Sequence, residues 1–127
     1  MGANNSMEKL YKITKNTNDE KADLLIENLE IIDSFFGRAK GLLGRQNLPM
    51  DQALWFRPGN NIHTFFMKFA IDCIFVNKSL KVEKVFSKVG PFRLIGPVWK
   101  ASSFIECSEG FIEKWDIKPG DQLYVVN

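Results

Sequence analysis

The spacing of apolar residues changes from strand-like to helical in the first part of the chain. Residues 25–31 carry their apolar side chains mainly on one face of an extended segment, which predicts a strand. Over residues 34–45 the apolar residues recur every three or four positions, which predicts an α-helix. Asp33 or Ser34 can cap its first turn, and Gly44 suits its C-terminal end. We expect this helix to be the only substantial one.

Short apolar runs alternate with turn sequences through the rest of the chain. We expect a short early strand at 8–13 and later strands near 53–56, 62–68, 70–77, 80–86, 103–107 and 122–126. Asn77-Lys78-Ser79 predicts a hairpin turn, and Lys118-Pro119-Gly120-Asp121 predicts a type II turn. One helix with many short strands predicts a mainly β fold, either a compact β-sandwich or a partly open barrel with one α-helix at about residues 34–45.

The domain organisation is predicted from length and from the polar N-terminus. A chain of 127 residues suits one domain and can bury a core without disulfides or metals. Residues 14–23 are polar and unpatterned. We therefore expect a mobile segment at 1–23 and a single β-rich domain at 24–127. The irregular segment 87–102 is long for a compact domain, and such loops are often functional.

Composition excludes several classes of partner. The net charge of +2 is too small for a nucleic-acid-binding face, and no apolar run approaches the roughly 20 residues of a membrane helix. The N-terminus has no apolar stretch typical of a secretion signal. Cys73 and Cys107 lie in apolar runs and are expected as reduced core residues. We expect a cytoplasmic, monomeric protein that binds neither nucleic acid nor membrane.

Two carboxylates, Asp72 and Glu106, stand in otherwise apolar strands. A carboxylate in such a place must be paired or protonated, because burying a lone charge is costly. Arg38 and Arg45 lie two turns apart on the predicted helix and can form bidentate pairs with carboxylates. We expect structural ion pairs that join helix and sheet. The alternative is that one arginine stays unpaired and binds an anionic or polar ligand.

The single histidine, His63, suggests a candidate binding surface. On a strand, His63, Phe65 and Met67 would share one face. His63 and Met67 would then be roughly 13 Å apart, too far to ligate one ion, and we expect neither a metal nor a cofactor. Together with Trp99 of the 87–102 segment, and with Arg38 and Arg45 at its border, this face is the candidate binding surface.

Three functions are compatible with these residues. The leading hypothesis is a non-enzymatic accessory protein that binds a small polar or anionic ligand or a protein segment. The alternative is an enzyme that uses His63 with Asp72 or Glu106 as acid–base groups in a polar pocket. A third is a module that pairs through an exposed strand edge.

Four motifs carry a resemblance to a known family. They are residues 38–45 (RAKGLLGR), 62–72 (IHTFFMKFAID), 104–110 (FIECSEG) and 119–121 (PGD). In this order they resemble domain-of-unknown-function family 192, which is widespread in bacteria and archaea. Members usually carry Pro at the position of Ala70. The resemblance covers about residues 25–126 and implies a compact β-sandwich or barrel with one helix. It brings no established activity, and export signals in many relatives leave the compartment open.

Overall fold

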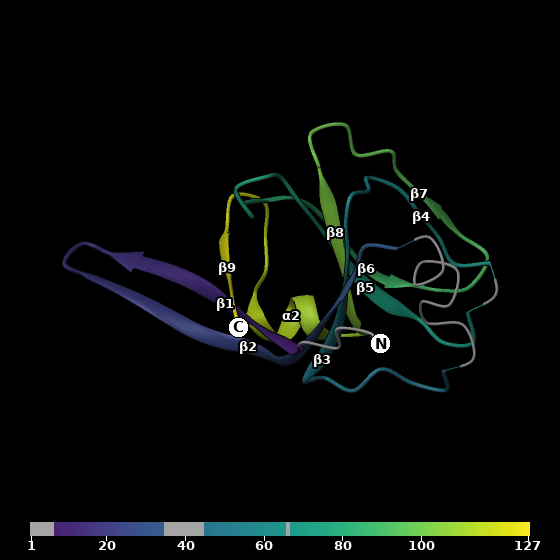
Figure 1. Cartoon of the computed structure of the whole chain (residues 1–127), viewed down its shortest axis with the longest axis horizontal. Coiled ribbons are helices and arrows are strands. Elements are labelled where there is room, and N and C mark those ends of the chain that lie inside the picture. Colours follow the sequence, from purple (N-terminus) through teal and green to yellow (C-terminus); the bar gives the residue numbers. More distant parts are fainter. Residues whose placement is uncertain (1–6, 35–44, 66) are drawn as a thin grey trace.

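The structure is a computed structural model that describes residues 7–34, 45–65 and 67–127. It is mainly β, as the sequence pattern predicts (Figure 1). Its elements are β1 (Met7–Asn16), β2 (Asp19–Ile32), β3 (Gln52–Phe56), β4 (Ile62–His63), β5 (Ile71–Val76), β6 (Val82–Val89), β7 (Leu94–Ile95), β8 (Ser103–Ser108), α2 (Phe111–Trp115) and β9 (Gln122–Val126). The predicted helix at 34–45 lies almost entirely outside the described residues.

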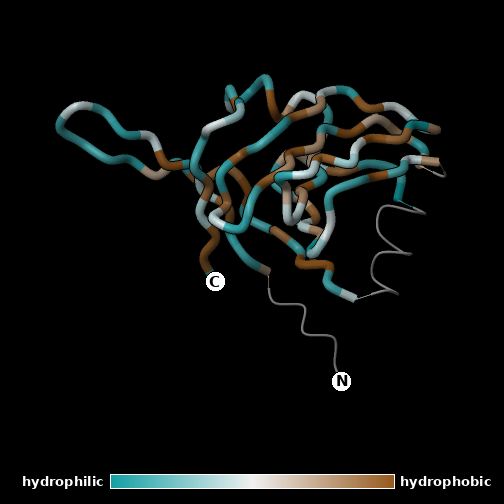
Figure 2. Tube along the Cα trace, turned by 90° about the horizontal axis from the view of Figure 1, so that it is seen from above, coloured by the Kyte–Doolittle hydropathy of each residue, from teal (hydrophilic) through white to brown (hydrophobic). Residues whose placement is uncertain are grey.

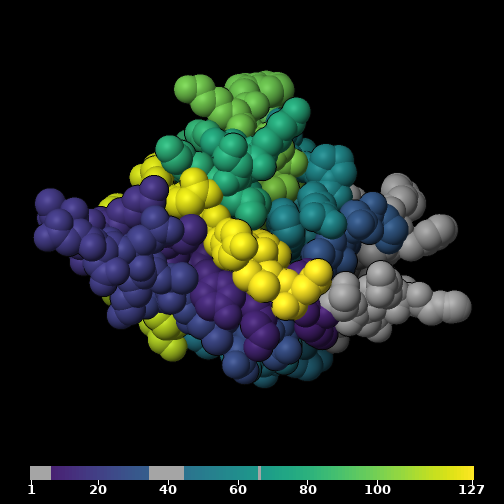
Figure 3. All heavy atoms as spheres, turned by 60° about the vertical axis from the view of Figure 1, so that its left-hand side comes forward, coloured from purple at the N-terminus to yellow at the C-terminus, as the bar shows by residue number. Residues whose placement is uncertain are grey.

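Seven strands form one mixed sheet in the order β6-β5-β8-β3-β2-β1-β9. β2 and β3 are parallel, and the other neighbours are antiparallel. The two edges approach each other at one end, where Lys81 and Gln122 form an isolated bridge and the Leu123 amide donates to the Leu80 carbonyl at 2.9 Å. Figure 3 shows β9 lying across the surface beside the N-terminal hairpin. The sheet is therefore a partly open barrel that closes only at one end.

Strands β1 and β2 form a long hairpin that projects from the body of the protein (Figure 1). The pairing extends to Asn16 opposite Asp19, so residues 14–16 and 19–23 belong to strands although their sequence shows no strand pattern. The outer part of the hairpin is exposed on both faces, which removes the apolar alternation that identifies a half-buried strand. Its mobility, and a domain boundary at residue 24, stay predictions.

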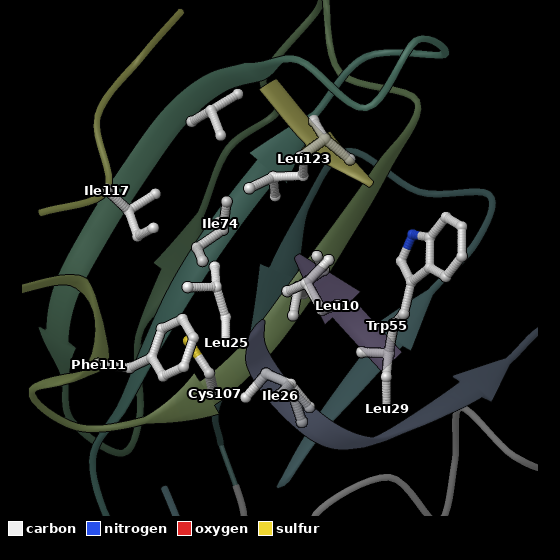
Figure 4. Close-up of a cluster of buried hydrophobic side chains, with 14 of the residues drawn as sticks. Leu10, Leu25, Ile26, Leu29, Trp55, Ile74, Cys107, Phe111, Ile117 and Leu123 are labelled. Atoms are coloured by element: carbon white, nitrogen blue, oxygen red, sulfur yellow. The ribbon is translucent and has the colours of Figure 1, made fainter. Parts of the chain in front are cut away.

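The core consists of two apolar clusters. Cluster 1 packs under α2 and includes Leu10, Ile26, Ile74, Cys107 and Phe111 (Figure 4). Cluster 2 includes Ile62, Met67, Cys73, Phe75 and Phe104. All six residues of β5 are buried, because apolar groups cover this strand on both faces.

Strands β4 and β7 form a separate two-stranded ribbon next to cluster 2. Ile62 pairs with Ile95, and His63 pairs with Leu94. Ile62 and Ile95 pack against cluster 2, so the ribbon is anchored by one of its faces. The predicted strand at 62–68 is thus much shorter than expected and ends at His63.

Candidate functional site

The ribbon presents its second face to solvent. The β4 segment contributes the exposed side chains of His63 and Phe65 to this face. The β7 segment contributes those of Phe92 and Leu94. Phe92 and Leu94 keep 74% and 72% of their surface accessible, and the Phe65 and His63 ring centroids are 5.4 Å apart. We call these four side chains the ribbon face. Exposed clusters of large apolar side chains on a soluble protein are typical of binding surfaces.

Thr64 holds the ribbon in place. It is fully buried, and its hydroxyl donates to the Gly90 carbonyl at 2.7 Å and accepts from the Arg93 amide at 2.9 Å. Its backbone N–H donates to the Arg93 carbonyl, and its carbonyl accepts from the Phe92 amide, both at 3.0 Å. Thr64 therefore connects the two sides of the ribbon through both side chain and backbone.

The predicted surface of His63, Phe65 and Met67 is only partly correct. His63 and Phe65 are exposed, whereas Met67 is 8% exposed and packs in cluster 2. The chain turns after Thr64, whose carbonyl accepts from the Met67 amide at 3.3 Å, so the strand alternation stops there. Trp99 is 82% exposed on the same 87–102 segment, and no ring contact between described residues joins it to the ribbon face.

Asp72 is satisfied by backbone groups. Its side chain is buried, and its two carboxylate oxygens accept from the amides of Lys88 and Ile112, each at 2.9 Å. The second of these bonds supplies an acceptor to a free N–H in the first turn of α2. Asp72 therefore joins β5 to the end of β6 and to the helix, without an arginine partner among the described residues.

Glu106 is the second buried acid, and its environment is apolar. In the sheet it stands directly between Leu54 of β3 and Cys73 of β5. Burial raises the pKa of the Glu106 carboxyl from 4.5 to about 8. Glu106 is therefore mainly protonated at neutral pH, and no cation among the described residues forms an ion pair with it. Burial, followed by the charges of Glu106 and Asp72, also raises the pKa of the Cys73 thiol.

Arg45 forms an ion pair with Glu30 instead of with the two buried acids. Its Nη2 lies 3.1 Å from Glu30 Oε2, and both side chains are about one-third exposed (37% and 34%). The pair lines a crevice of about 360 Å³ beside β2 and β3. Arg38 lies outside the described residues, so its pairing stays a prediction.

Other candidate chemistry is limited in the part of the chain that the structure describes. No three His, Cys, Asp or Glu side chains there gather in a way that could hold a metal ion. Both cysteines are free and buried. None of the described helices is long and apolar enough to cross a membrane.

Phe92 and Leu94 lie in the 87–102 segment, which the sequence interpretation includes in the candidate surface without singling out these two residues. One signal could have drawn attention to them: residues 57–71 and 84–105 contain no Asp or Glu. The basic residues in these two segments are Arg57, Lys68, Lys84, Lys88, Arg93 and Lys100. The region around the ribbon is thus both apolar and basic, in a chain whose net charge is only +2.

Comparisons with known proteins give a consistent result. The chain matches the family model DUF192, described as an uncharacterised ACR, over residues 14–125. It is 31% identical over 112 residues to a UPF0127 protein of Thermococcus sibiricus, a match covering 84% of this chain and 71% of the relative. It is 36% identical over 100 residues to a UPF0127 protein of Pyrococcus horikoshii, covering 75% of this chain and 84% of the relative.

The fold also resembles a solved structure. A candidate transcription regulator from Sinorhizobium meliloti superimposes with a TM-score of 0.75 over 98% of both chains, at 14% identity. At that identity the similarity concerns the fold alone. The family match and the two sequence relatives confirm the resemblance carried by the four motifs. The chain belongs to domain-of-unknown-function family 192, a family of uncharacterised proteins.

Proposed function

We propose that this protein is a non-enzymatic binding module whose ribbon face binds an extended polypeptide segment with apolar and acidic side chains. The observation that carries the proposal is the exposure of large apolar side chains on a rigid, basic ribbon. Phe92 and Leu94 are each more than 70% exposed (74% and 72%), although they lie next to a well-packed core.

The apolar character of the ribbon face favours a protein partner. Aromatic side chains and arginine are enriched at the centres of protein interfaces, and this surface offers Phe65, Phe92 and Arg93. Burying two phenylalanines and a leucine under a partner removes a large apolar area from water, at about 25 cal/mol per Å² before the costs of association.

The charge around the ribbon favours an acidic partner. Lys68, Lys88, Arg93 and Lys100 are exposed, and the two segments that contain them have no acidic residue. Complementary charges mainly increase the association rate and the specificity of an interface. An acidic segment would therefore be attracted to the ribbon before its apolar side chains make contact.

The fixed geometry of the ribbon also supports binding. A surface that is ordered before the partner arrives loses less conformational entropy on association. Thr64 supplies that order here through its bonds to Gly90 and Arg93.

The acid–base alternative has less support. His63 is exposed on the ribbon, whereas Asp72 and Glu106 are buried in the main sheet. Neither His63 nor the two acids line the crevice beside Arg45. Asp72 is moreover occupied by two backbone amides.

The proposal can be tested by selecting ligands from a random peptide display library. We expect the selected peptides to combine Phe, Trp or Leu with Asp or Glu. Their affinity, measured by fluorescence anisotropy, should fall at least about 100-fold in the double variant Phe92→Ser with Leu94→Ser, since interface anchors contribute about 2 kcal/mol or more each. Tyr124→Ser is the control, because Tyr124 is also exposed (54%) but lies on β9.

Two results would overturn the proposal. One is a selection whose peptides bind the double variant and the parent protein equally well. The other is binding to vesicles that contain anionic phospholipid, sensitive to Phe92→Ser with Leu94→Ser, in the absence of any selected peptide. That second result would assign the ribbon face to a lipid surface.

A further inference from the structure

A second cleft lies at one end of the main sheet, and none of the four ribbon-face side chains lines it. It has a volume of about 540 Å³. Four strands contribute to its lining. The residues come from the end of β3, from the segments that follow β2, β3 and β5, and from the start of β8. The lining side chains used below are Asp33, Trp55, Arg57, Asn77, Lys78 and Ser103. A cleft of this volume suits a small metabolite.

Arg57 is presented to the cleft with its donors available. The guanidinium carbon lies 4.6 Å from the centroid of the Trp55 ring, which fixes the group by a cation–π contact. Trp55 is itself fixed, because its indole N–H donates to the Ser103 hydroxyl at 2.9 Å. Figure 4 shows Trp55 on the opposite side of cluster 1 from Phe111. Within the described residues, Arg57 forms no ion pair with a carboxylate.

The backbone around Arg57 is also well anchored. The Arg57 amide donates to the Ile32 carbonyl at 3.0 Å, and the Gly59 amide donates to the Ser102 carbonyl at 2.9 Å. The Ser102 amide donates to the Val76 carbonyl at 2.9 Å. These bonds join the walls of the cleft to β2 and β5.

Lys78 supplies a second cation from the turn between β5 and β6. Asn77 fixes this turn, since its side-chain oxygen accepts from the amides of Ser79 and Lys81 at 2.9 and 3.1 Å. The Asn77 side-chain amide also donates to Glu83 at 3.0 Å. Lys78 itself is exposed and forms no ion pair among the residues that the structure describes.

Among the described residues that line this cleft, Asp33 is the only acidic one. It is exposed and, like Arg57, forms no ion pair with a described residue. The lining thus combines two cations with one anion. A planar guanidinium matches a carboxylate, and a carboxylate such as Asp33 accepts hydrogen bonds from hydroxyl or ammonium groups.

From this arrangement we infer that the cleft binds a small organic monocarboxylate that also carries a hydroxyl or ammonium group. The ligand carboxylate bonds to Arg57 and Lys78, and its hydroxyl or ammonium group donates to Asp33. The described lining has a net charge of +1, from two cations and one anion, which matches the hydroxyl-bearing form of this ligand, because that form carries one negative charge. This site is independent of the ribbon face, so either proposal can fail without the other.

The test uses the indole N–H signal of Trp55 in two-dimensional NMR spectra. The probes are lactate and glucuronate, which carry a carboxylate and hydroxyl groups. Acetate lacks the hydroxyl, glucose lacks the carboxylate, and inorganic phosphate is a different anion. We expect saturable shifts with lactate and glucuronate, weaker binding of acetate, and no shift with glucose or phosphate.

Single substitutions test separately the cationic part of the site, at Arg57, and the acidic part, at Asp33. Arg57→Gln should weaken the binding of lactate and glucuronate by about tenfold or more, because a charge-assisted hydrogen bond is lost. Asp33→Asn should weaken both to the level of acetate and leave acetate unchanged. Arg45→Gln removes the same charge at the other crevice and should leave all dissociation constants unchanged.

Three results would overturn the inference. The first is the absence of any shift with lactate or glucuronate at concentrations up to tens of millimolar. The others are equal binding by Arg57→Gln and the parent protein, and phosphate binding as tight as that of lactate. Melting temperatures of all variants verify that they are folded. If Arg57→Gln does not fold, Arg57→Lys replaces it, and that variant should retain weaker binding because it keeps the charge but loses the planar fork.

Discussion

Two antiparallel ribbons, the β1–β2 hairpin of the main sheet and the separate β4–β7 ribbon, have surfaces of opposite character. The β1–β2 hairpin projects far from the body and is hydrophilic at its tip (Figure 2). Its exposed charges pair across the strands, as Lys15 does with Glu20 at 3.8 Å. The shorter β4–β7 ribbon exposes leucine, phenylalanines lie exposed beside it, and the two segments around it, 57–71 and 84–105, contain basic but no acidic residues.

The difference shows that the exposed side chains of only one of these two ribbons call for a role other than stabilising the fold. A hairpin with mixed charges is well solvated and needs no partner, and its surface ion pairs contribute little stability. Exposed phenylalanine and leucine contribute little to folding as well, but they cost solubility, so their presence on the β4–β7 ribbon favours a binding role. Three changes test this contrast, starting with the largest expected effect.

The first change is made at Glu106, the buried acid on the side of the main sheet that faces the ribbon. Glu106 stands opposite Cys73, whose cluster also contains Ile62 of the ribbon. The folded protein keeps the Glu106 proton up to about pH 8, whereas the unfolded chain loses it near pH 4.5. Between these values the unfolded state binds fewer protons, so the free energy of unfolding should fall by up to about 1.4 kcal/mol per pH unit, on the order of 5 kcal/mol in total.

Urea denaturation at pH 5 and pH 8 measures this loss. Glu106→Gln should lose much less stability than the parent protein over the same range, because its side chain does not titrate. The control is Glu20→Gln on the hairpin, whose exposed carboxylate should leave the parent pH dependence unchanged. An equal loss in Glu106→Gln and the parent protein would show that another group is responsible.

The second change removes the side-chain hydrogen bonds that fix the ribbon. Thr64→Val keeps the shape of the side chain but leaves the Gly90 carbonyl and the Arg93 amide without their partner. We expect a loss of about 2–3 kcal/mol in the free energy of unfolding, because Thr64 is fully buried. Thr14→Val on the exposed hairpin is the matched control and should stay within about 0.5 kcal/mol. Equal effects of the two substitutions would contradict the role of Thr64.

Most of the fold could be predicted from local patterns, and the exceptions have physical causes. The apolar runs at 53–56 and 122–126 predict strands close to the observed bounds of β3, which is buried on both faces, and of β9. The outer β1–β2 hairpin is exposed on both faces and has no apolar period to detect. The helix α2 is only five residues long, too short for helical spacing to be recognised.

The candidate site was less predictable, because it depends on contacts between distant segments. His63 and Phe65 are exposed, whereas Met67, which a continuous strand would place on the same face, is buried. The turn after Thr64 depends on Gly90 and Arg93, which lie 26 and 29 residues away. The protonated state of Glu106 likewise follows from three-dimensional burial, which a local pattern does not determine.

The third change should have the smallest effect on stability and decides what the exposed residues are for. Phe92→Ser with Leu94→Ser should alter the free energy of unfolding by less than about 1 kcal/mol, since both side chains are mainly exposed at 74% and 72%. Ile62→Ser on the buried face of the same ribbon should cost about 3 kcal/mol or more. Chemical denaturation of both variants measures the contrast. A large loss in the double variant would mean that Phe92 and Leu94 stabilise the fold, and the apolar surface would then no longer favour a partner. A small loss, combined with the loss of peptide binding, would separate the two faces of the ribbon into one that anchors it and one that binds.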